Sequence, residues 1–174
     1  MEFRFETRYD QKGLTVMARA LRKTIRKKHS RRSHIFGWCV VALAILLIAV
    51  ERMLEEPWTV RDTLNLCVGV ILIAILLTED QVNAFFAKKK MLPGTSAAKS
   101  VFTEEGYTSA TEAAVTEFHY ETVQQVCETA DYFVLLLSRQ HGQIYDKATL
   151  SGGTAEDFRT FITEKTGKPI VSIK

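Results

Sequence analysis

The hydrophobic and polar positions of the chain form two apolar runs set among alternating and amphipathic segments. Residues 35–50 and 64–77 contain no charged side chain and are separated by a short polar stretch. Runs of this length form roughly 21–24 Å of α-helix, not far short of the roughly 30 Å of a bilayer core. We therefore predict a transmembrane hairpin with spans at 35–52 and 63–80 and an outside loop at 53–62. Buried helices of a soluble all-helical domain are the alternative, which the flanking charges disfavour.

Cations gather on the outer sides of both runs and indicate the orientation of the hairpin. They are Arg19, Arg22, Lys23, Arg26, Lys27, Lys28, Arg31 and Arg32 before the first run, and Lys88, Lys89 and Lys90 after the second. The stretch between the runs, residues 51–62, carries two arginines against four acidic residues. Because cytoplasmic flanks of membrane helices are rich in Lys and Arg, we expect a multi-pass membrane protein with both termini in the cytoplasm.

Residues 11–34 have the pattern of a basic amphipathic helix. Asp10 is a plausible N-cap, and the helix is expected to continue directly into the first membrane span. One apolar stripe is formed by Leu14, Met17, Leu21 and Ile25. The cations of this segment and of residues 88–90 either contact anionic lipid headgroups or only set the orientation, and the sequence leaves both interpretations open.

The remaining polar and apolar positions predict a small β domain. Residues 2–9 alternate, with Phe3 and Phe5 on one face, so this stretch is expected to form a half-buried strand. A single strand needs partners, and these follow the hairpin. The predicted strands are 99–103, 107–111, 115–118, 123–128, 132–138 and 143–145. A final helix over residues 155–165 is expected to begin at a capping box of Thr154 with Asp157 and to end at Gly167.

These elements predict a membrane α+β protein in which the hairpin is inserted into one antiparallel β domain closed by a C-terminal helix. The expected order is a first strand in 1–10, a basic helix in 11–34, the hairpin region in 35–86, a linker in 87–98 and the main part of the cytosolic domain in 99–174. Charge divides the chain in the same way. Residues 1–34 carry a net charge of +8 and residues 91–174 a net charge of −4, so we expect no nucleic-acid binding by the domain.

Three segments of the β domain resemble the YcxB-like family of bacterial membrane proteins. They are residues 120–137 (YETVQQVCETADYFVLLL), 144–147 (IYDK) and 156–161 (EDFRTF). The chain has Tyr120 where Trp is expected and Asp146 where Pro is expected. The resemblance implies a pleckstrin-homology-like fold, in which a bent antiparallel sheet is closed by a C-terminal helix, and it implies no established activity.

The residues that carry chemistry in enzymes form no recognisable motif in this sequence. The four histidines lack the paired spacing of a zinc site, and no nucleophile or phosphate-loop signature occurs, so we expect no enzyme activity, metal or cofactor. Cys39 and Cys67 are expected at different membrane depths, which excludes a disulfide between them. Gly152 and Gly153 are expected to form a plain loop rather than a phosphate cradle.

Two groups of polar residues are candidates for a specific role. The first is a polar surface site, formed by Tyr120, Glu128, Asp131 and Lys147, for which a tight turn and a solvated face are the alternatives. The second is the acidic pair Glu79 and Asp80 at the end of the second span. We expect this pair to meet the basic residues that precede the first span, which are Arg31, Arg32 and His34.

The sequence therefore favours binding over catalysis. We expect a membrane-anchored cytosolic binding module that tethers a protein or a ligand at the inner membrane. The alternative is a ligand-gated membrane effector, in which the β domain senses a small molecule such as a nucleotide and drives hairpins to assemble into homo-oligomers. The expected partners are membrane lipids together with an unknown protein or small molecule.

Overall fold

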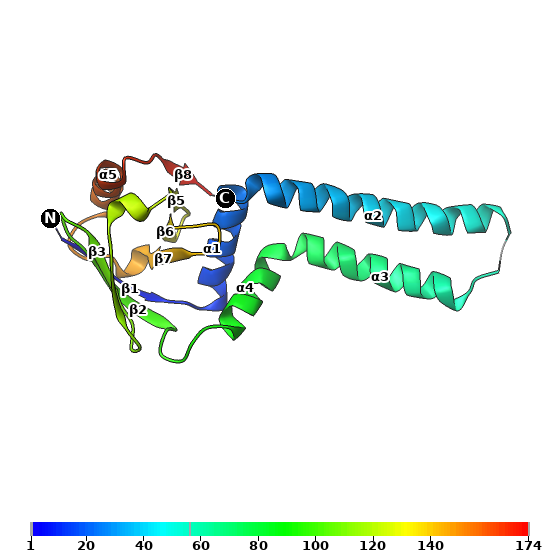
Figure 1. Ribbon diagram of the computed structural model, residues 1–174, viewed down its shortest axis with the longest axis horizontal. Helices are drawn as coiled ribbons and strands as arrows, with labels where there is room; N and C mark the ends of the chain where they lie inside the picture. The colour runs from blue at the N-terminus through cyan, green and yellow to red at the C-terminus, as the bar shows by residue number, and fades with distance from the viewer. Residues whose placement is uncertain (1, 56, 174) are drawn as a thin grey trace.

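A long helical hairpin extends from a β domain in the computed structural model, which describes residues 2–55 and 57–173 (Figure 1). The hairpin consists of α2 (Lys27–Met53) and α3 (Val60–Leu77), about 40 Å and 27 Å long at 1.5 Å per residue. Both helices are long and apolar enough to cross a membrane, and only 6% of the most apolar window of each is buried inside the protein. The prediction of two membrane-length apolar helices is confirmed, and they are not the core helices of a soluble domain.

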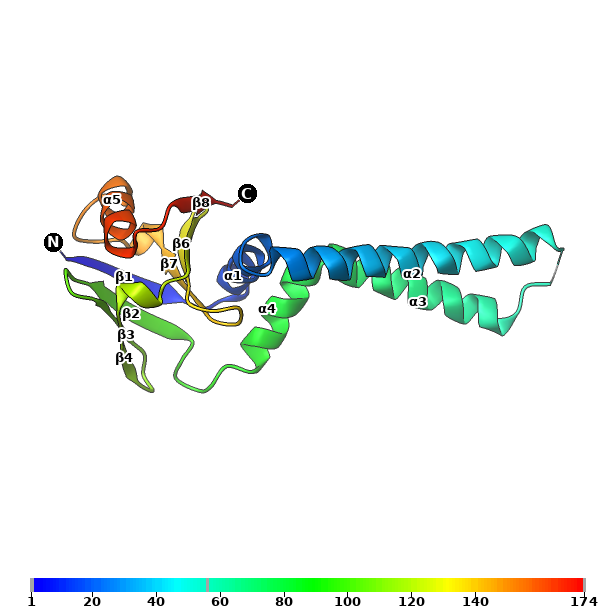
Figure 2. The same cartoon turned by 45° about the horizontal axis from the view of Figure 1, so that its top comes forward.

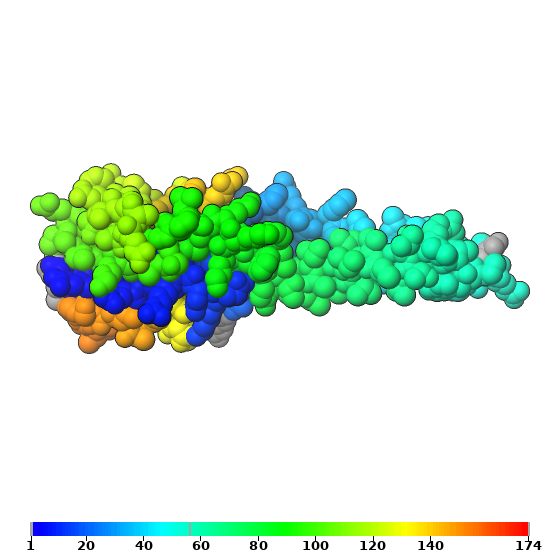
Figure 3. Space-filling view, turned by 90° about the horizontal axis from the view of Figure 1, so that it is seen from below, coloured from blue at the N-terminus to red at the C-terminus, as the bar shows by residue number. Residues whose placement is uncertain are grey.

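The space-filling view shows the hairpin as a narrow rod that projects from the β domain (Figure 3). Its two helices approach closely near the domain, where a Cβ atom added to Gly37 would lie 2.8 Å from Leu76 Cδ2. At the far end, Arg52 lies 3.6 Å from Asp62, and Thr59 forms a capping box with Asp62 at the start of α3. Gly37 lets the two helices pack closely because it has no side chain. The pairing of Arg52 with Asp62 reduces the cost of keeping these two charges next to the apolar runs.

The basic segment is not one continuous helix, which corrects the prediction for residues 11–34. Helix α1 (Gln11–Lys23) begins at the predicted N-cap Asp10, whose side chain accepts a hydrogen bond from the Gly13 N–H. It ends at Thr24, which has the non-helical dihedral angles φ −119° and ψ −93°. The break lets the apolar stripe of α1 stay on the β domain while α2 turns away from it (Figure 2). A straight helix could not satisfy both requirements.

The second span also ends earlier than predicted, because Thr78 separates α3 from α4 (Glu79–Lys89). Helix α4 packs against α1, so the two short helices form a platform between the β domain and the hairpin (Figure 1). Helix α1 runs across the base of the hairpin rather than along it.

Strand β1 (Phe3–Arg8) pairs antiparallel with β2 (Ala97–Phe102), although the whole helical region lies between them in the sequence. The prediction that the first strand pairs beyond the hairpin is confirmed. The first sheet has the order β1-β2-β3-β4, with β3 at Tyr107–Ala110 and β4 at Val115–Phe118. In the space-filling view β1 lies between the β2–β4 region and the segment before α5, where Arg4 bridges to Ser151 (Figure 3).

The second sheet has the order β7-β6-β5-β8. Its strands are β5 (Gln125–Glu128), β6 (Tyr132–Leu136), β7 (Gly142–Asp146) and β8 (Ile170–Ser172). Every residue of β6 is buried because both of its faces are covered, which explains its continuous apolar sequence. Phe133 and Leu135 belong to the main core, whereas Val134 and Leu136 pack with Leu21 of α1. Strand β8 was not predicted, and its pairing with β5 is parallel.

The main core lies between the two sheets and α5 (Ala155–Thr166). Phe3 and Phe5 are buried in this core as predicted. The ring centroid of Phe5 lies 4.9 Å from that of Phe158 on α5. The capping box of Thr154 with Asp157 and the left-handed Gly167 bound the helix as expected. Two single-turn 3-10 helices, η1 (Tyr120–Thr122) and η2 (Lys147–Thr149), complete the described elements.

Candidate functional site

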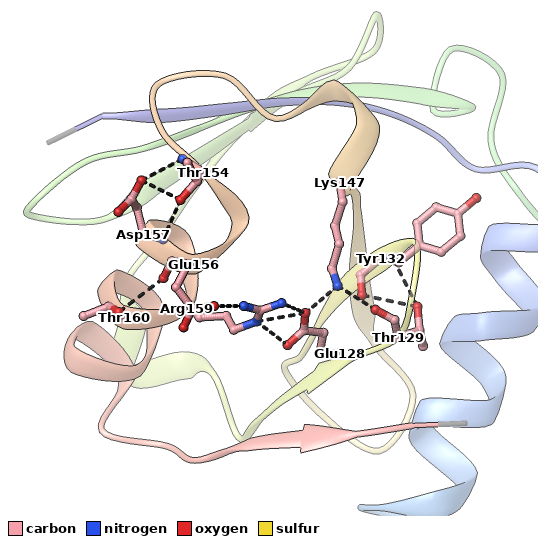
Figure 4. Close-up of polar contacts among 9 residues, drawn as sticks. All are labelled: Glu128, Thr129, Tyr132, Lys147, Thr154, Glu156, Asp157, Arg159 and Thr160. Carbon is pink, nitrogen blue, oxygen red and sulfur yellow. Dashed lines mark hydrogen bonds and ion pairs between the residues drawn. The ribbon is translucent and has the colours of Figure 1, made fainter.

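Three of the four predicted polar-site residues meet at one end of the second sheet. Glu128 ends β5, Asp131 lies in the turn to β6, and Lys147 follows β7, which pairs with β6. The Lys147 ammonium group donates to the Glu128 carboxylate and, at 2.6 Å, to the Thr129 carbonyl oxygen (Figure 4). The Lys147 backbone N–H donates to the Asp131 carbonyl oxygen at 2.9 Å. These contacts join the ends of β5 and β7 and the turn before β6 into one hydrogen-bonded cluster of polar residues.

Arg159 of α5 completes this cluster, although it was not among the predicted residues of the polar site. Its Nε donates to Glu128 Oε2 at 2.8 Å and its Nη2 to Glu128 Oε1 at 2.9 Å (Figure 4). Burial by itself would raise the pKa of Glu128, but the hydrogen bonds from Arg159 and Lys147 outweigh it and lower that pKa. The carboxylate is therefore held ionised between two cations.

Lys12 of α1 brings the first helix to the same site. Its Nζ donates to Asp131 Oδ2 at 2.7 Å, and it lies 5.7 Å from the centre of the Tyr132 ring. The hydrogen bond with Lys12 lowers the pKa of Asp131, and the same bond raises the pKa of Lys12. Both side chains are more than half exposed, so their ion pair contributes little to stability by itself.

A pocket of about 840 Å³ lies between these residues and α1. Its charged lining consists of four cations and two carboxylates, which are Lys12, Arg19, Lys147, Arg159, Glu128 and Asp131. Val16, Tyr132 and Ile173 add apolar surface. The volume falls in the range of small-molecule sites, and the excess of cations suits a ligand or peptide segment that carries negative charge.

Tyr120 does not belong to this pocket. Its side chain is buried in the main core, and its hydroxyl lies 2.6 Å from the Thr103 carbonyl oxygen and 3.1 Å from that of Gly106. Burial raises the pKa of Tyr120 well above its usual range. The residue closes the β2–β3 hairpin onto the core, so it has a structural position rather than a place at the surface site.

The acidic pair at the base of the hairpin finds partners that differ in part from those predicted. Asp80 accepts two hydrogen bonds of 2.7 Å from Arg22, and Arg19 lies 3.6 Å from the same carboxylate. Glu79 lies 2.6 Å from His34 Nε2, as expected. None of the ion pairs in the described part of the chain joins this acidic pair to Arg31 or Arg32, since α1 folds back beside α4.

The other predicted cations lie around the same platform. Lys23 ends α1, Arg26 precedes α2, and Lys88, Lys89 and Lys90 lie at the end of α4. Four more cations occupy the first turns of α2, which are Lys27, Lys28, Arg31 and Arg32. Within residues 2–55 and 57–173, no three His, Cys, Asp or Glu side chains come together as a metal site requires.

Gly152 and Gly153 lie beside the start of strand β1, and the atoms around them explain why glycine is needed at both positions. Gly152 has φ +94°, and a Cβ atom added there would lie 2.0 Å from the Glu2 carbonyl oxygen. A Cβ atom on Gly153 would lie 2.6 Å from the Phe3 ring. Both glycines therefore let this loop pack closely against the first strand.

Comparison with known proteins places the site within a family signature. Neither the curated proteins nor the solved structures give a match. Residues 102–162 match the family model described as YcxB-like protein. This range runs from the end of β2 to Ile162 of α5 and includes Glu128, Asp131, Lys147 and Arg159. Over the segment that contains most of the candidate site, the chain therefore carries the pattern of the YcxB-like family, as the sequence motifs predicted.

Proposed function

We propose that this protein is a two-pass membrane anchor for a cytosolic binding domain, which holds a protein or ligand at the bacterial inner membrane. The exposed apolar hairpin supports the membrane part of the proposal. The cations on the domain side of both helices support an orientation with both termini in the cytoplasm.

A pleckstrin-homology-like fold is part of this proposal. The two four-stranded sheets are mainly antiparallel and enclose one aromatic core, and α5 packs on that core through Phe158, Phe161 and Ile162. The family match supports the same assignment. Sheets of this kind leave loops at their ends free for binding, which is where the candidate pocket lies.

The observation that carries the proposed role is the double use of α1. Lys12, Val16 and Arg19 follow one another along one face of α1 and line the binding pocket. Arg19 and the neighbouring Arg22 also contact Asp80 of α4, at the base of the hairpin. The wall of the pocket is thus fixed directly to the membrane anchor, and any ligand in the pocket is held at a set distance from the bilayer.

The mechanism would be a gain in effective concentration. A partner held at the membrane surface meets other membrane-bound molecules within a thin layer, so their encounter becomes nearly intramolecular. This requires no chemical step at the site. It requires only that the domain keep its position relative to the hairpin, which the contacts between α1 and α4 provide.

The orientation can be tested by cysteine labelling in intact cells. In a background that lacks the three native cysteines, Glu55→Cys should react with a membrane-impermeant maleimide from outside, and Ser172→Cys should react only after lysis. Glu55 follows the end of α2, whereas Ser172 lies in β8 of the domain. The reverse pattern would contradict the proposed topology.

The binding role can be tested by photo-crosslinking in membranes. A photoreactive side chain at Ala130, which is exposed at the pocket, should capture a discrete partner or ligand, whereas the same group at the exposed Val115 of β4 should not. Lys12→Glu should abolish the crosslink at 130, and Lys168→Glu, an exposed cation outside the pocket lining, should preserve it. Equal crosslinking at both positions would refute the pocket as the binding site, and capture of a second copy of the chain would favour an assembling effector.

A further inference from the structure

A second pocket lies at the corner where α1 meets α2, and its lining is strongly basic. It has a volume of about 480 Å³ and is bounded on one side by Arg22, Lys23, Lys27, Arg31 and His34. Its other side is formed by Val171, Ser172 and Ile173 at the end of β8. Figure 2 shows that this strand ends beside the corner between α1 and α2. No acidic side chain is found among its described lining residues. The pocket therefore concentrates positive charge in a concave site.

Two of these cations are not used by the fold. Arg22 is held by Asp80 and His34 by Glu79. Lys27 and Arg31 are exposed, and neither forms an ion pair with another described residue. They are one helical turn apart on α2, so both face the pocket. A pair of cations in this arrangement can hold one phosphate group between them.

The depth of the pocket relative to the apolar run indicates what kind of phosphate it meets. Arg31 and Lys27 precede Ile35, where the apolar run begins, by about 6 Å and 12 Å of helix at 1.5 Å per residue. The headgroup layer of each leaflet is about 5–8 Å thick. The pocket therefore begins within this layer and opens toward the cytosol if α2 spans the membrane as proposed above.

We propose that this corner pocket binds the phosphate of an anionic phospholipid, with Lys27 and Arg31 as its main ligands. The inference rests on the proposed membrane insertion but is independent of the binding role of the first pocket. Lys28 and Arg32 lie on the same turns of α2 at nearly the same depth, but they do not line the pocket. Specific lipid binding should therefore depend on Lys27 and Arg31, whereas an orientation signal should depend equally on all four cations.

Lys28 and Arg32 supply a matched control for Lys27 and Arg31. The full-length protein in detergent micelles is titrated with phosphatidylglycerol, and the first bound lipid is counted by native mass spectrometry. Lys27→Gln with Arg31→Gln should weaken this binding about 30-fold, since each cation near a membrane surface contributes up to about 1 kcal/mol. Lys28→Gln with Arg32→Gln removes the same charge and should weaken it less than about threefold. Ser172→Glu, which adds a carboxylate to the β8 wall, should weaken it without removing a cation.

Three results would overturn the inference. Equal losses in the two double variants would show general charge attraction, and equal binding of phosphatidylcholine would show that the headgroup charge is not recognised. Displacement of the lipid by millimolar inorganic phosphate would assign the site to a free anion. Resistance of the wild-type protein to carbonate extraction is measured separately, so that a failure of membrane insertion is distinguished from a failure of lipid recognition.

Discussion

The ion pair between Arg22 and Asp80 is expected to fix the β domain to the hairpin, and Asp80→Asn tests this with a nearly isosteric change. The Asp80 side chain is only 8% exposed and that of Arg22 30%, and two hydrogen bonds of 2.7 Å join them. The hydrogen bond with Asp80 also raises the pKa of Arg22, which favours the charged guanidinium beside the carboxylate. The asparagine amide keeps the shape of the carboxylate but loses its charge and one acceptor.

The magnitude follows from the burial of this pair. A hydrogen bond to a charged group contributes about 1.5–3 kcal/mol, and an unpaired buried cation adds a cost of its own. Because Arg22 can still reach some solvent, we expect Asp80→Asn to lower the free energy of separating α1 from α4 by about 2–3 kcal/mol. Amide hydrogen exchange in α4 should then be roughly 30- to 140-fold faster, as measured by mass spectrometry on the full chain in micelles.

The exposed pair of Lys12 with Asp131 is the control, because it has the same 2.7 Å separation with side chains that are 64% and 54% exposed. Asp131→Asn should lower the same free energy by at most about 1 kcal/mol, so amide hydrogen exchange should become at most about fivefold faster. Adding Arg22→Gln to Asp80→Asn should cause little further loss, since the two residues act together. Equal effects of Asp80→Asn and Asp131→Asn, or additive effects of the two junction changes, would refute the reasoning.

Three further predictions concern the β domain and can be measured by chemical unfolding of the full chain in micelles. Phe5→Ala should cost about 3–5 kcal/mol because Phe5 is 1% exposed, whereas Val115→Ala, at 69% exposure, should cost less than about 0.5 kcal/mol. Gly152→Ala should destabilise by more than Gly167→Ala, since both have positive φ but only Gly152 would bring its Cβ against backbone; equal costs would contradict this. Glu128 has a lowered pKa in the folded protein, so its contribution is present above its ordinary value of 4.5 and is lost as the pH falls through the folded pKa. Glu128→Gln should therefore flatten the acid dependence of stability, and an unchanged dependence would show that Glu128 is not its source.

The elements that arise from local causes could be predicted from the order of the amino acids. These elements are the two apolar runs, the strand in which buried Phe3 and Phe5 alternate with exposed residues, the N-cap at Asp10 and the capping box at Thr154. Each depends on residues within a short stretch of the chain. Such patterns act through periodicity and nearby hydrogen bonds, so they can be recognised without knowledge of the rest of the fold.

Which distant residues meet depends on how the helices and sheets pack against one another. The sequence indicated that Asp80 would find a cation, but the break at Thr24 and the packing of α1 against α4 selected Arg22 rather than Arg31 or Arg32. Arg159 joins Glu128 for a similar reason, because the position of α5 over the sheet is set by its buried aromatic face.

The same distinction explains the two pockets. The sequence made Tyr120 a candidate for the polar site on the same footing as the residues at 128, 131 and 147. The structure instead buries Tyr120 in the main core, away from the pocket. Lys27 and Lys28 carry the same charge, but only Lys27 lines the corner pocket together with β8. The reason is that a charge count is a property of composition, whereas a binding site requires directions in space, which arise only when the helices and sheets have packed.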